Sequence, residues 1–150
     1  MTTATQSTAQ GLAQACAAHI VPHEPLFTQF GIELVDVGPG RATLGMTVRD
    51  DMLNQQGVCH GGILFTLADS AVGIACNSHN ERALTSNCAI EFMRPARVGD
   101  RLSAIATEIQ RGRRTGLYDV RVTAADGSLV ALLRGRSMTV GGTVIPADAQ

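Results

Sequence analysis

Hydrophobic residues are densest between Ile63 and Cys76, where they face nearly every side of a helix rather than one stripe. The segment is too long for a typical strand, and its alanines favour helix. We therefore expect a central helix that is buried all round. One carboxylate, Asp69, lies in its middle, and a charge in apolar surroundings needs a partner or a function.

Regular alternation of apolar and polar residues predicts a half-buried strand at Arg41–Arg49. Ile32–Val37 precedes it across a turn at residues 37–40, so the two segments predict a hairpin. Beyond the central helix, four further strands are predicted at Ala83–Met93, Asp100–Arg111, Thr115–Ala124 and Leu129–Val140. Turn residues, mainly glycine and proline, separate these strands.

The two ends of the chain carry weaker patterns. Residues 10–21 predict an amphipathic helix that ends before Pro22, whereas residues 1–9 are expected to be disordered and residues 144–150 to form a loose tail. A loop containing Phe27 and Phe30 leads to the first strand. The whole pattern predicts one α+β domain at residues 10–143, in which an antiparallel sheet curls around one long helix and a short helix precedes it.

Composition and charge exclude several classes of function. A net charge of -1 and a pI near 6.4 provide no broad basic field for nucleic acid or an anionic membrane. No apolar window is long enough to span a bilayer and no signal-peptide pattern is visible, so we expect a cytoplasmic protein. All 12 basic residues are arginine, which excludes lysine nucleophiles and Schiff bases.

The cysteines and histidines form no metal-binding pattern. The 4 cysteines lack C-x-x-C spacing and lie mostly in apolar surroundings, so we interpret them as reduced, buried small residues: Cys16, Cys59, Cys76 and Cys88. The 4 histidines are scattered, and Cys59 beside His60 does not form a ligand spacing. We expect no metal.

Cys59-His60-Gly61-Gly62 directly precedes the apolar run. A helix N-terminus has free N–H groups and a partial positive charge, which can stabilise the oxyanion of a reacting carbonyl. Gly61 and Gly62 suit this role because they let a ligand approach the backbone, although steric relief between helix and sheet is the alternative explanation. We expect His60 to cap the helix or order the loop rather than to transfer protons.

Asp69 lies eight residues after Gly61, which corresponds to about 12 Å along a helix, so both cannot touch one carbonyl. If both are catalytic, the aspartate must come from a second protomer whose helix runs antiparallel across a twofold axis. Each dimer then has two composite sites. The alternative for Asp69 is a structural carboxylate satisfied by Ser70, Thr66 or an arginine.

Two polar residues extend this candidate site. Asn54, in the loop before the helix, can hydrogen-bond the attacking water or the carbonyl, although Asn54-Gln55-Gln56-Gly57 also has the composition of a turn. Thr66 lies one helical turn before Asp69 and shares its face, so its hydroxyl can bond water or the carboxylate.

Taken together, these segments resemble the phenylacetate-pathway thioesterases, a branch of the hotdog-fold superfamily that hydrolyses hydroxylated phenylacetyl-CoA and related aryl-acyl thioesters. The resemblance rests on Met52-Leu53-Asn54, Cys59-His60-Gly61-Gly62, Leu64-Phe65, Leu67-Ala68-Asp69-Ser70-Ala71, Ala75-Cys76-Asn77-Ser78, Phe92-Met93-Arg94-Pro95, Arg134-Gly135-Arg136-Ser137 and Gly141-Gly142-Thr143. The spacing from Asn54 through His60 to Asp69 is the most specific part.

The resemblance implies a hotdog fold and an acyl-CoA thioesterase that uses no organic cofactor or metal. It implies that Asp69 acts as general base on water or as nucleophile, and that the backbone N–H of Gly61 polarises the thioester carbonyl. It also implies a homodimer as the working unit, paired again into a homotetramer.

A CoA ester needs a channel with arginine or backbone N–H groups at its mouth for the phosphates. Arg94 and Pro95, in a loop after a strand, are the first choice, and the other candidates are Arg97, Arg111, Arg113, Arg114 and Arg136. An apolar slot for the acyl group, which would suit an aryl ring, can be formed by Phe65, Leu53, Phe92 and Met93.

Two other functions fit a hotdog chain. A hydratase or dehydratase acts on the acyl chain and pairs an acid with a histidine placed for C–H chemistry, whereas His60 here starts the helix. An acyl-CoA sensor would use the same pocket for binding alone. A regulator of that kind normally adds a DNA-reading segment, and no basic helix-turn-helix is present.

Overall fold

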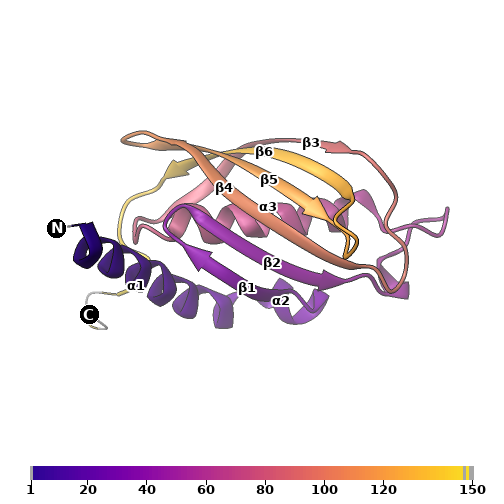
Figure 1. The fold of residues 1–150 in the computed structure, drawn as a ribbon, viewed down its shortest axis with the longest axis horizontal. Helices are drawn as coiled ribbons and strands as arrows, with labels where there is room; N and C mark the ends of the chain where they lie inside the picture. Colours follow the sequence, from indigo (N-terminus) through magenta and orange to yellow (C-terminus); the bar gives the residue numbers. More distant parts are fainter. Residues whose placement is uncertain (1, 147, 149–150) are drawn as a thin grey trace.

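The computed structural model describes residues 2–146 and 148, and for residues 2–7 only the backbone. In this described part of the chain, three α-helices, two 3₁₀ helices and six strands follow one another (Figure 1). Their bounds are α1 Thr2–Ile20, η1 Val21–His23, α2 Pro25–Phe30, β1 Glu33–Gly38, β2 Arg41–Thr47, η2 Asp50–Met52, α3 Gly61–Asn77, β3 Ala83–Phe92, β4 Arg101–Arg111, β5 Thr115–Thr123 and β6 Leu129–Thr139.

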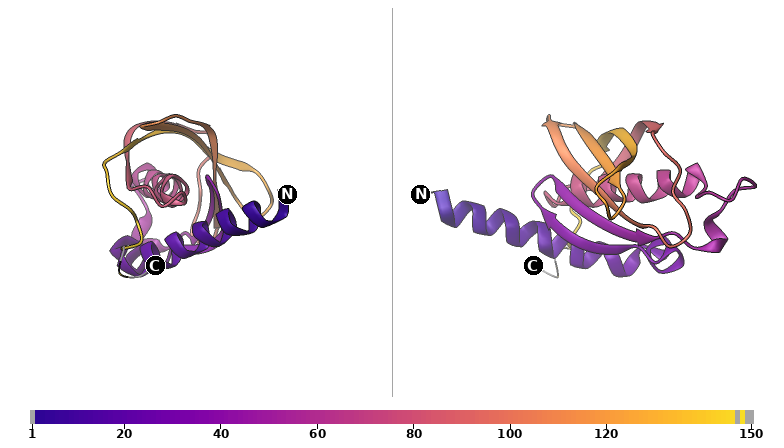
Figure 2. Two further views of the ribbon diagram at one scale, coloured as in Figure 1. Left: turned by 90° about the vertical axis from the view of Figure 1, so that its left-hand side faces the viewer. Right: turned by 45° about the vertical axis from the view of Figure 1, so that its right-hand side comes forward.

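The strands form one antiparallel sheet in the order β1-β2-β4-β5-β6-β3. Helix α3 connects β2 to β3, which lie near opposite edges, and it contacts every strand. Seen along the helix axis, the sheet curves around α3 (Figure 2, left). The predicted α+β hotdog architecture is therefore confirmed, and the strand bounds differ from the predicted ones by at most two residues.

A continuous apolar core joins the concave face of the sheet to α3. Alternate residues of β2 and β4 point inward and are fully buried, among them Leu44, Met46 and Leu102, where they meet Leu67 and Ala71 of the helix. Burying each leucine contributes about 1.5–3 kcal/mol, so this layer fixes the position of α3 on the sheet.

Two features near the N-terminus differ from the prediction. The first helix begins at Thr2 rather than at residue 10, and residues 2–9 contain no proline or glycine that would prevent helix. The segment with Phe27 and Phe30 is not a loop but the short helix α2, with Pro25 in its first turn and Gly31 (φ 62°) ending it. Both are recognised helix-terminus signals, which the apolar pattern alone did not reveal.

Helix α3 is not buried on every side in the single chain, which corrects the prediction. Leu64, Leu67, Ala71 and their neighbours are buried, but a stripe along the helix remains partly or fully open. The stripe consists of small and polar residues and one aromatic residue: Gly62, Phe65, Thr66, Asp69, Ser70, Gly73 and Asn77. The number of apolar residues alone could not reveal this open stripe, because two of its residues are glycines, which count as neither apolar nor polar.

Part of the predicted C-terminal tail, residues 144–150, lies outside the described residues. Within the described part, the backbone N–H of Ile145 donates to Asn80 Oδ1 (2.9 Å), which holds this point of the tail against the turn after α3. In the described part of the chain, no helix is both long and apolar enough to cross a bilayer.

Candidate active site

The loop that leads into α3 is fixed by backbone hydrogen bonds on both sides. His60 N–H donates to Met52 O (2.7 Å), and Cys59 N–H donates to Ala96 O (2.8 Å). Between them, Asn54 Oδ1 accepts the backbone N–H groups of Gln56 (2.9 Å) and Val58 (3.4 Å). Asn54 therefore shapes the turn with its oxygen, as its turn composition suggested, while its side-chain NH₂ has no acceptor among the described residues.

His60 caps α3, as predicted. Its Nδ1 accepts the backbone N–H of Gly62 (2.9 Å), and its backbone is extended, which is the usual conformation of a capping residue. Because Nδ1 accepts this bond, the neutral imidazole carries its proton on Nε2. The cap satisfies Gly62 but not its neighbour, since the N–H of Gly61 has no acceptor in the described part of the chain.

Gly61 has the geometry of an anion-binding position. Its N–H lies at the positive end of α3, where the helix dipole favours negative charge. The Phe92 ring packs over the residue, and a Cβ at Gly61 would lie 3.0 Å from Phe92 Cζ. A side chain here would push against the ring, so the glycine lets an apolar group on β3 sit directly beside a free backbone donor.

Asp69 lies on the open stripe of α3, two helical turns after Gly61, and is partly buried. No cation bonds its carboxylate among the described residues, and the Thr66 hydroxyl donates to Gly62 O (2.9 Å) instead. The only described hydrogen bond to the carboxylate comes from the thiol of Cys88 on β3 (Sγ to Oδ1, 3.9 Å). Within the described part of one chain, no salt bridge accounts for this acid.

The structure gathers several predicted residues at the N-terminal end of α3. Arg94 and Pro95 follow β3 there, directly before Ala96, which bonds Cys59. Arg94 is not free: its guanidinium bonds Ser128 Oγ and lies 3.8 Å from Asp126 Oδ2, which ties the loop to the β5–β6 turn. Phe65 packs partly buried against the core from the same half of α3.

Two predicted arginines lie elsewhere in the single chain. Arg113 belongs to the β4–β5 turn, at the end of the molecule opposite the loop that enters α3 (Figure 1). Arg136 is exposed on β6. A Cβ at its neighbour Gly135 would point at Val72 of α3, and because successive residues of a strand face opposite sides of the sheet, Arg136 lies on the convex face. Neither arginine has a described contact with Asp69 or Gly61 in the single chain: Arg113 lies in a turn at the other end of the molecule, and Arg136 faces the opposite side of the sheet from its neighbour Gly135.

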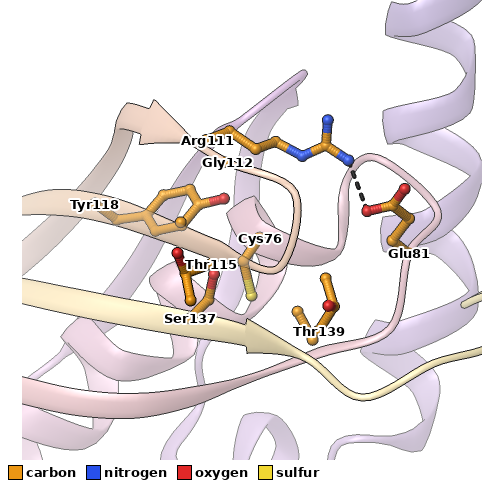
Figure 3. Close-up of a pocket in the computed structure, with 10 residues that line it drawn as sticks. Cys76, Glu81, Arg111, Gly112, Thr115, Tyr118, Ser137 and Thr139 are labelled. Atoms are coloured by element: carbon orange, nitrogen blue, oxygen red, sulfur yellow. Dashed lines mark hydrogen bonds and ion pairs between the residues drawn. The ribbon is translucent and has the colours of Figure 1, made fainter.

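A second polar cluster, which the sequence did not suggest, lies at the C-terminal end of α3. Glu108 Oε2 accepts hydrogen bonds from Tyr118 OH (2.8 Å) and His79 Nε2 (2.8 Å). Beside it, a small hollow is lined by Cys76, Tyr118 and Ser137, and Arg111 pairs with Glu81 (2.8 Å) next to it (Figure 3). Burial raises the pKa of Cys76 to about 12, so its thiol stays protonated and unreactive at neutral pH.

Among the described residues, no group of three or more histidine, cysteine or acidic side chains is placed to hold a metal ion. The candidate site offers three protein groups: the Asp69 carboxylate, which has no cation partner among the described residues, the N–H of Gly61 and the NH₂ of Asn54. Such a set can deprotonate or deliver water and stabilise a developing oxyanion.

Comparison with known proteins gives consistent results. Residues 56–131 match the family described as the thioesterase superfamily. The acyl-coenzyme A thioesterase PaaI of Escherichia coli (strain K12) is 44% identical over 114 residues, covering 76% of this chain and 81% of that protein. A putative esterase from Archaeoglobus fulgidus is 35% identical over 117 residues, covering 78% of this chain and 76% of the esterase.

Solved structures show the same likeness. The structure of the Escherichia coli PaaI protein from the phenylacetic acid degradation operon superposes with a TM-score of 0.88 at 39% identity, covering 89% of this chain and 97% of that one. The protein smu.793 from Streptococcus mutans UA159, solved with acetyl CoA bound, gives a TM-score of 0.73 at 28% identity, covering 75% of this chain and 90% of that one.

Proposed function

The chain belongs to the thioesterase superfamily and is a thioester hydrolase acting on acyl-CoA, and we propose that it hydrolyses aryl-acyl-CoA such as (hydroxy)phenylacetyl-CoA to the free acid and CoA. The Asp69 carboxylate, which lies on the open stripe of α3 without a cation partner among the described residues, carries this proposal. A partly buried acid without a cation is costly unless it has a task, and such groups concentrate at active sites.

In the proposed reaction, the Gly61 N–H and the α3 N-terminus stabilise the oxyanion that forms as the thioester carbonyl is attacked. Asp69 acts in one of two ways. As general base it takes a proton from water, and the hydroxide adds to the carbonyl carbon. As nucleophile it forms a mixed anhydride that water then hydrolyses. In both routes the C–S bond breaks and the CoA thiolate leaves and becomes protonated.

A homodimer, paired again into a homotetramer, is the proposed assembly. Along α3, Gly61 and Asp69 are about 12 Å apart, so one site needs the aspartate of one protomer and the glycine of another. Two surfaces support this arrangement. The open stripe of α3 is lined by small residues, and the edge strand β3 exposes Leu84 (64%) and Phe92 (51%). Covering both would bury an unpaired edge and apolar side chains.

The substrate slot is proposed next to the α3 N-terminus. Phe65, Phe92, Leu53 and Met93 lie at this end, and their apolar surfaces suit an aryl ring. Of the predicted phosphate ligands, Arg94 with Pro95 lies at this end of a protomer, as does Arg97 next to Ala96, whereas Arg113 and Arg136 can contribute only from another protomer. The similarity to PaaI supports the aryl-acyl preference.

Asp69→Asn removes the proposed base and keeps the shape of the side chain. We expect normal thermal unfolding and a fall in kcat of at least about 100-fold, because general-base catalysis contributes about 10²–10⁴-fold. Released thiol, measured across a panel of aryl and alkyl CoA esters, reports both the loss and the acyl preference. Wild-type kcat in this variant would exclude the assigned role, and binding of CoA esters by the unaltered protein without hydrolysis would indicate a sensor.

The composite site can be tested by subunit mixing. Gly61→Val places a side chain against Phe92 and is expected to inactivate its own half of the site. A heterodimer of Gly61→Val and Asp69→Asn then contains one intact site. Equal mixing, with exchange of subunits by mild unfolding, should restore about a quarter of wild-type activity, because half of the dimers are mixed and each has one of two sites. No recovery in verified heterodimers would contradict the shared site.

A further inference from the structure

Cys88 is the one described side chain that donates a hydrogen bond to Asp69. It lies on β3, faces α3 and is partly buried. Its thiol reaches the Oδ1 atom at 3.9 Å, which is within range for a weak bond from sulfur. Oδ2 has no described partner and stays available for water or the thioester carbonyl.

The neighbouring strand leaves room for this contact. Gly135 lies directly opposite Cys88 in the β3–β6 register. A Cβ at Gly135 would sit 3.4 Å from Cys88 Sγ and 3.3 Å from Val72 Cγ2, the second of which is tighter than ordinary packing. Because Gly135 has no side chain, β6 leaves room for the Cys88 thiol on β3 to lie close to α3.

We propose that Cys88 is a positioning residue for the thioesterase reaction: its S–H holds one oxygen of the Asp69 carboxylate, which aims the other oxygen at the reacting carbonyl. This inference rests on the proposed catalytic role of Asp69. It differs from a packing role, which any residue of similar size would fill, because the thiol must donate a proton in a hydrogen bond.

The protonation state of the thiol supports this role. Burial, and then the negative charge of Asp69, raise the pKa of Cys88 to about 11, so at neutral pH the group is an S–H donor and not a repelling thiolate. Cys76 is the other titratable group that interacts with Asp69, but its thiol donates to Gly73 O within the same helix (3.5 Å). No described cation bonds Asp69 from any element packed around it.

Kinetics give the first test. In Cys88→Ala, kcat should fall about 3- to 10-fold with a smaller change in KM, because the lost bond orients the base rather than binds substrate. Cys88→Ser keeps a hydrogen-bond donor at this position and should recover part of the lost kcat. A wild-type kcat in Cys88→Ala, or a Cys88→Ser variant no more active than Cys88→Ala, would overturn the proposal.

Cys16→Ala is the matched control. Cys16 is also buried, and its thiol also donates to a side-chain oxygen, Asn80 Oδ1 at 3.8 Å, but it lies on α1 far along the chain from the site. It reproduces the loss of a buried S–H···O contact without touching Asp69. We expect wild-type kcat and KM. An equal fall in kcat in both variants would overturn the proposal in favour of a general stability effect.

Infrared spectroscopy separates this inference from the proposed function. The S–H stretching band of Cys88, assigned by its loss in Cys88→Ala, should lie at lower frequency than that of an unbonded thiol, and should shift in Asp69→Asn. This readout needs no catalysis. If Asp69→Asn remains active while the band shifts, the proposed function fails and the contact stands. If Asp69→Asn is inactive and the band does not move, the positioning role fails.

Discussion

Two adjacent glycines at the start of α3 have different surroundings. The N–H of Gly62 is satisfied by His60 Nδ1, and a Cβ on Gly62 would lie 3.1 Å from that atom. The N–H of Gly61 has no described acceptor, and the Phe92 ring packs over this residue. The His60 cap therefore satisfies the backbone N–H of Gly62 and leaves the N–H of Gly61 available to a ligand.

The capping role of His60 predicts how substitutions behave. His60→Ala should lower the free energy of unfolding by about 1 kcal/mol, because the Gly62 N–H loses its partner. His60→Asn retains a good capping acceptor and should keep most of the stability and most of the kcat. Urea denaturation and thiol release measure the two quantities. A stable His60→Asn variant with kcat reduced a hundredfold would show that the imidazole transfers protons as well.

At the scale of elements, α3 carries the proposed chemistry and the sheet holds it at both ends. The loop before α3 is bonded to Met52 and Ala96, as described above. At its other end, Ser78 Oγ accepts the backbone N–H of Gly40 (2.8 Å), and His79 bonds Glu108 of β4. Because both ends are anchored, the open stripe of α3 presents Asp69 in a fixed direction, which a shared site requires.

Two glycine substitutions, one on a strand and one on a helix, should change the free energy of unfolding with opposite signs. In Gly116→Ala, on β5, the new Cβ would lie 2.7 Å from Tyr118 Cε2 and 2.9 Å from Ser137 Oγ, so we expect a loss of about 1–3 kcal/mol. In Gly11→Ala, on α1, no atom lies within 4 Å of the new Cβ, and alanine favours helix, so we expect a gain of about 0.5–1 kcal/mol. Chemical denaturation checks both signs. A destabilised Gly11→Ala variant would show that α1 makes contacts beyond this chain.

For the whole molecule, buried thiols link stability to alkaline pH. Burial raises the pKa of Cys59 and Cys88 to about 11 and that of Cys76 to about 12, from 9.0. Between pH 9 and about 11 the unfolded chain loses thiol protons that the folded chain keeps, so the free energy of unfolding falls as pH rises through this range. Below pH 9 both states keep these protons, and the contribution is fully present.

Thermal unfolding in a reducing buffer at about pH 8 and about pH 10.5 should therefore show a lower Tm at the higher pH. The chain contains no lysine, whose deprotonation would otherwise overlap with this range. Cys76→Ala removes the thiol with the largest shift, and its Tm should depend less on pH than that of the unaltered protein. Equal pH dependence in the two proteins would contradict the assignment to this buried thiol.

Periodicity in the sequence determined the six strands, the central helix and the curving of the sheet around that helix. Alternation and apolar runs reveal these features because they are local consequences of which face of an element is buried. Sequence reasoning also placed His60 at the helix cap and Asp69 mid-helix, since both follow from counting along one element. The extent of the domain at 10–143 and the site roles of Asn54, Asp69 and Gly61 stay predictions. Helix α2 was missed, although Pro25 and Gly31 marked its ends.

Only the tertiary structure decided which side chains meet. Cys88 was interpreted as a small buried residue, and nothing along the chain places it against Asp69, because the contact requires β3 to cross the sheet and lie beside α3. In the same way, Arg136 shares a motif with Gly135 but faces the opposite side of the sheet, and the open stripe of α3 exists because the sheet covers only part of the helix. Local pattern fixes the elements, whereas contacts between distant segments depend on strand order and register, which the spacing of residues does not contain.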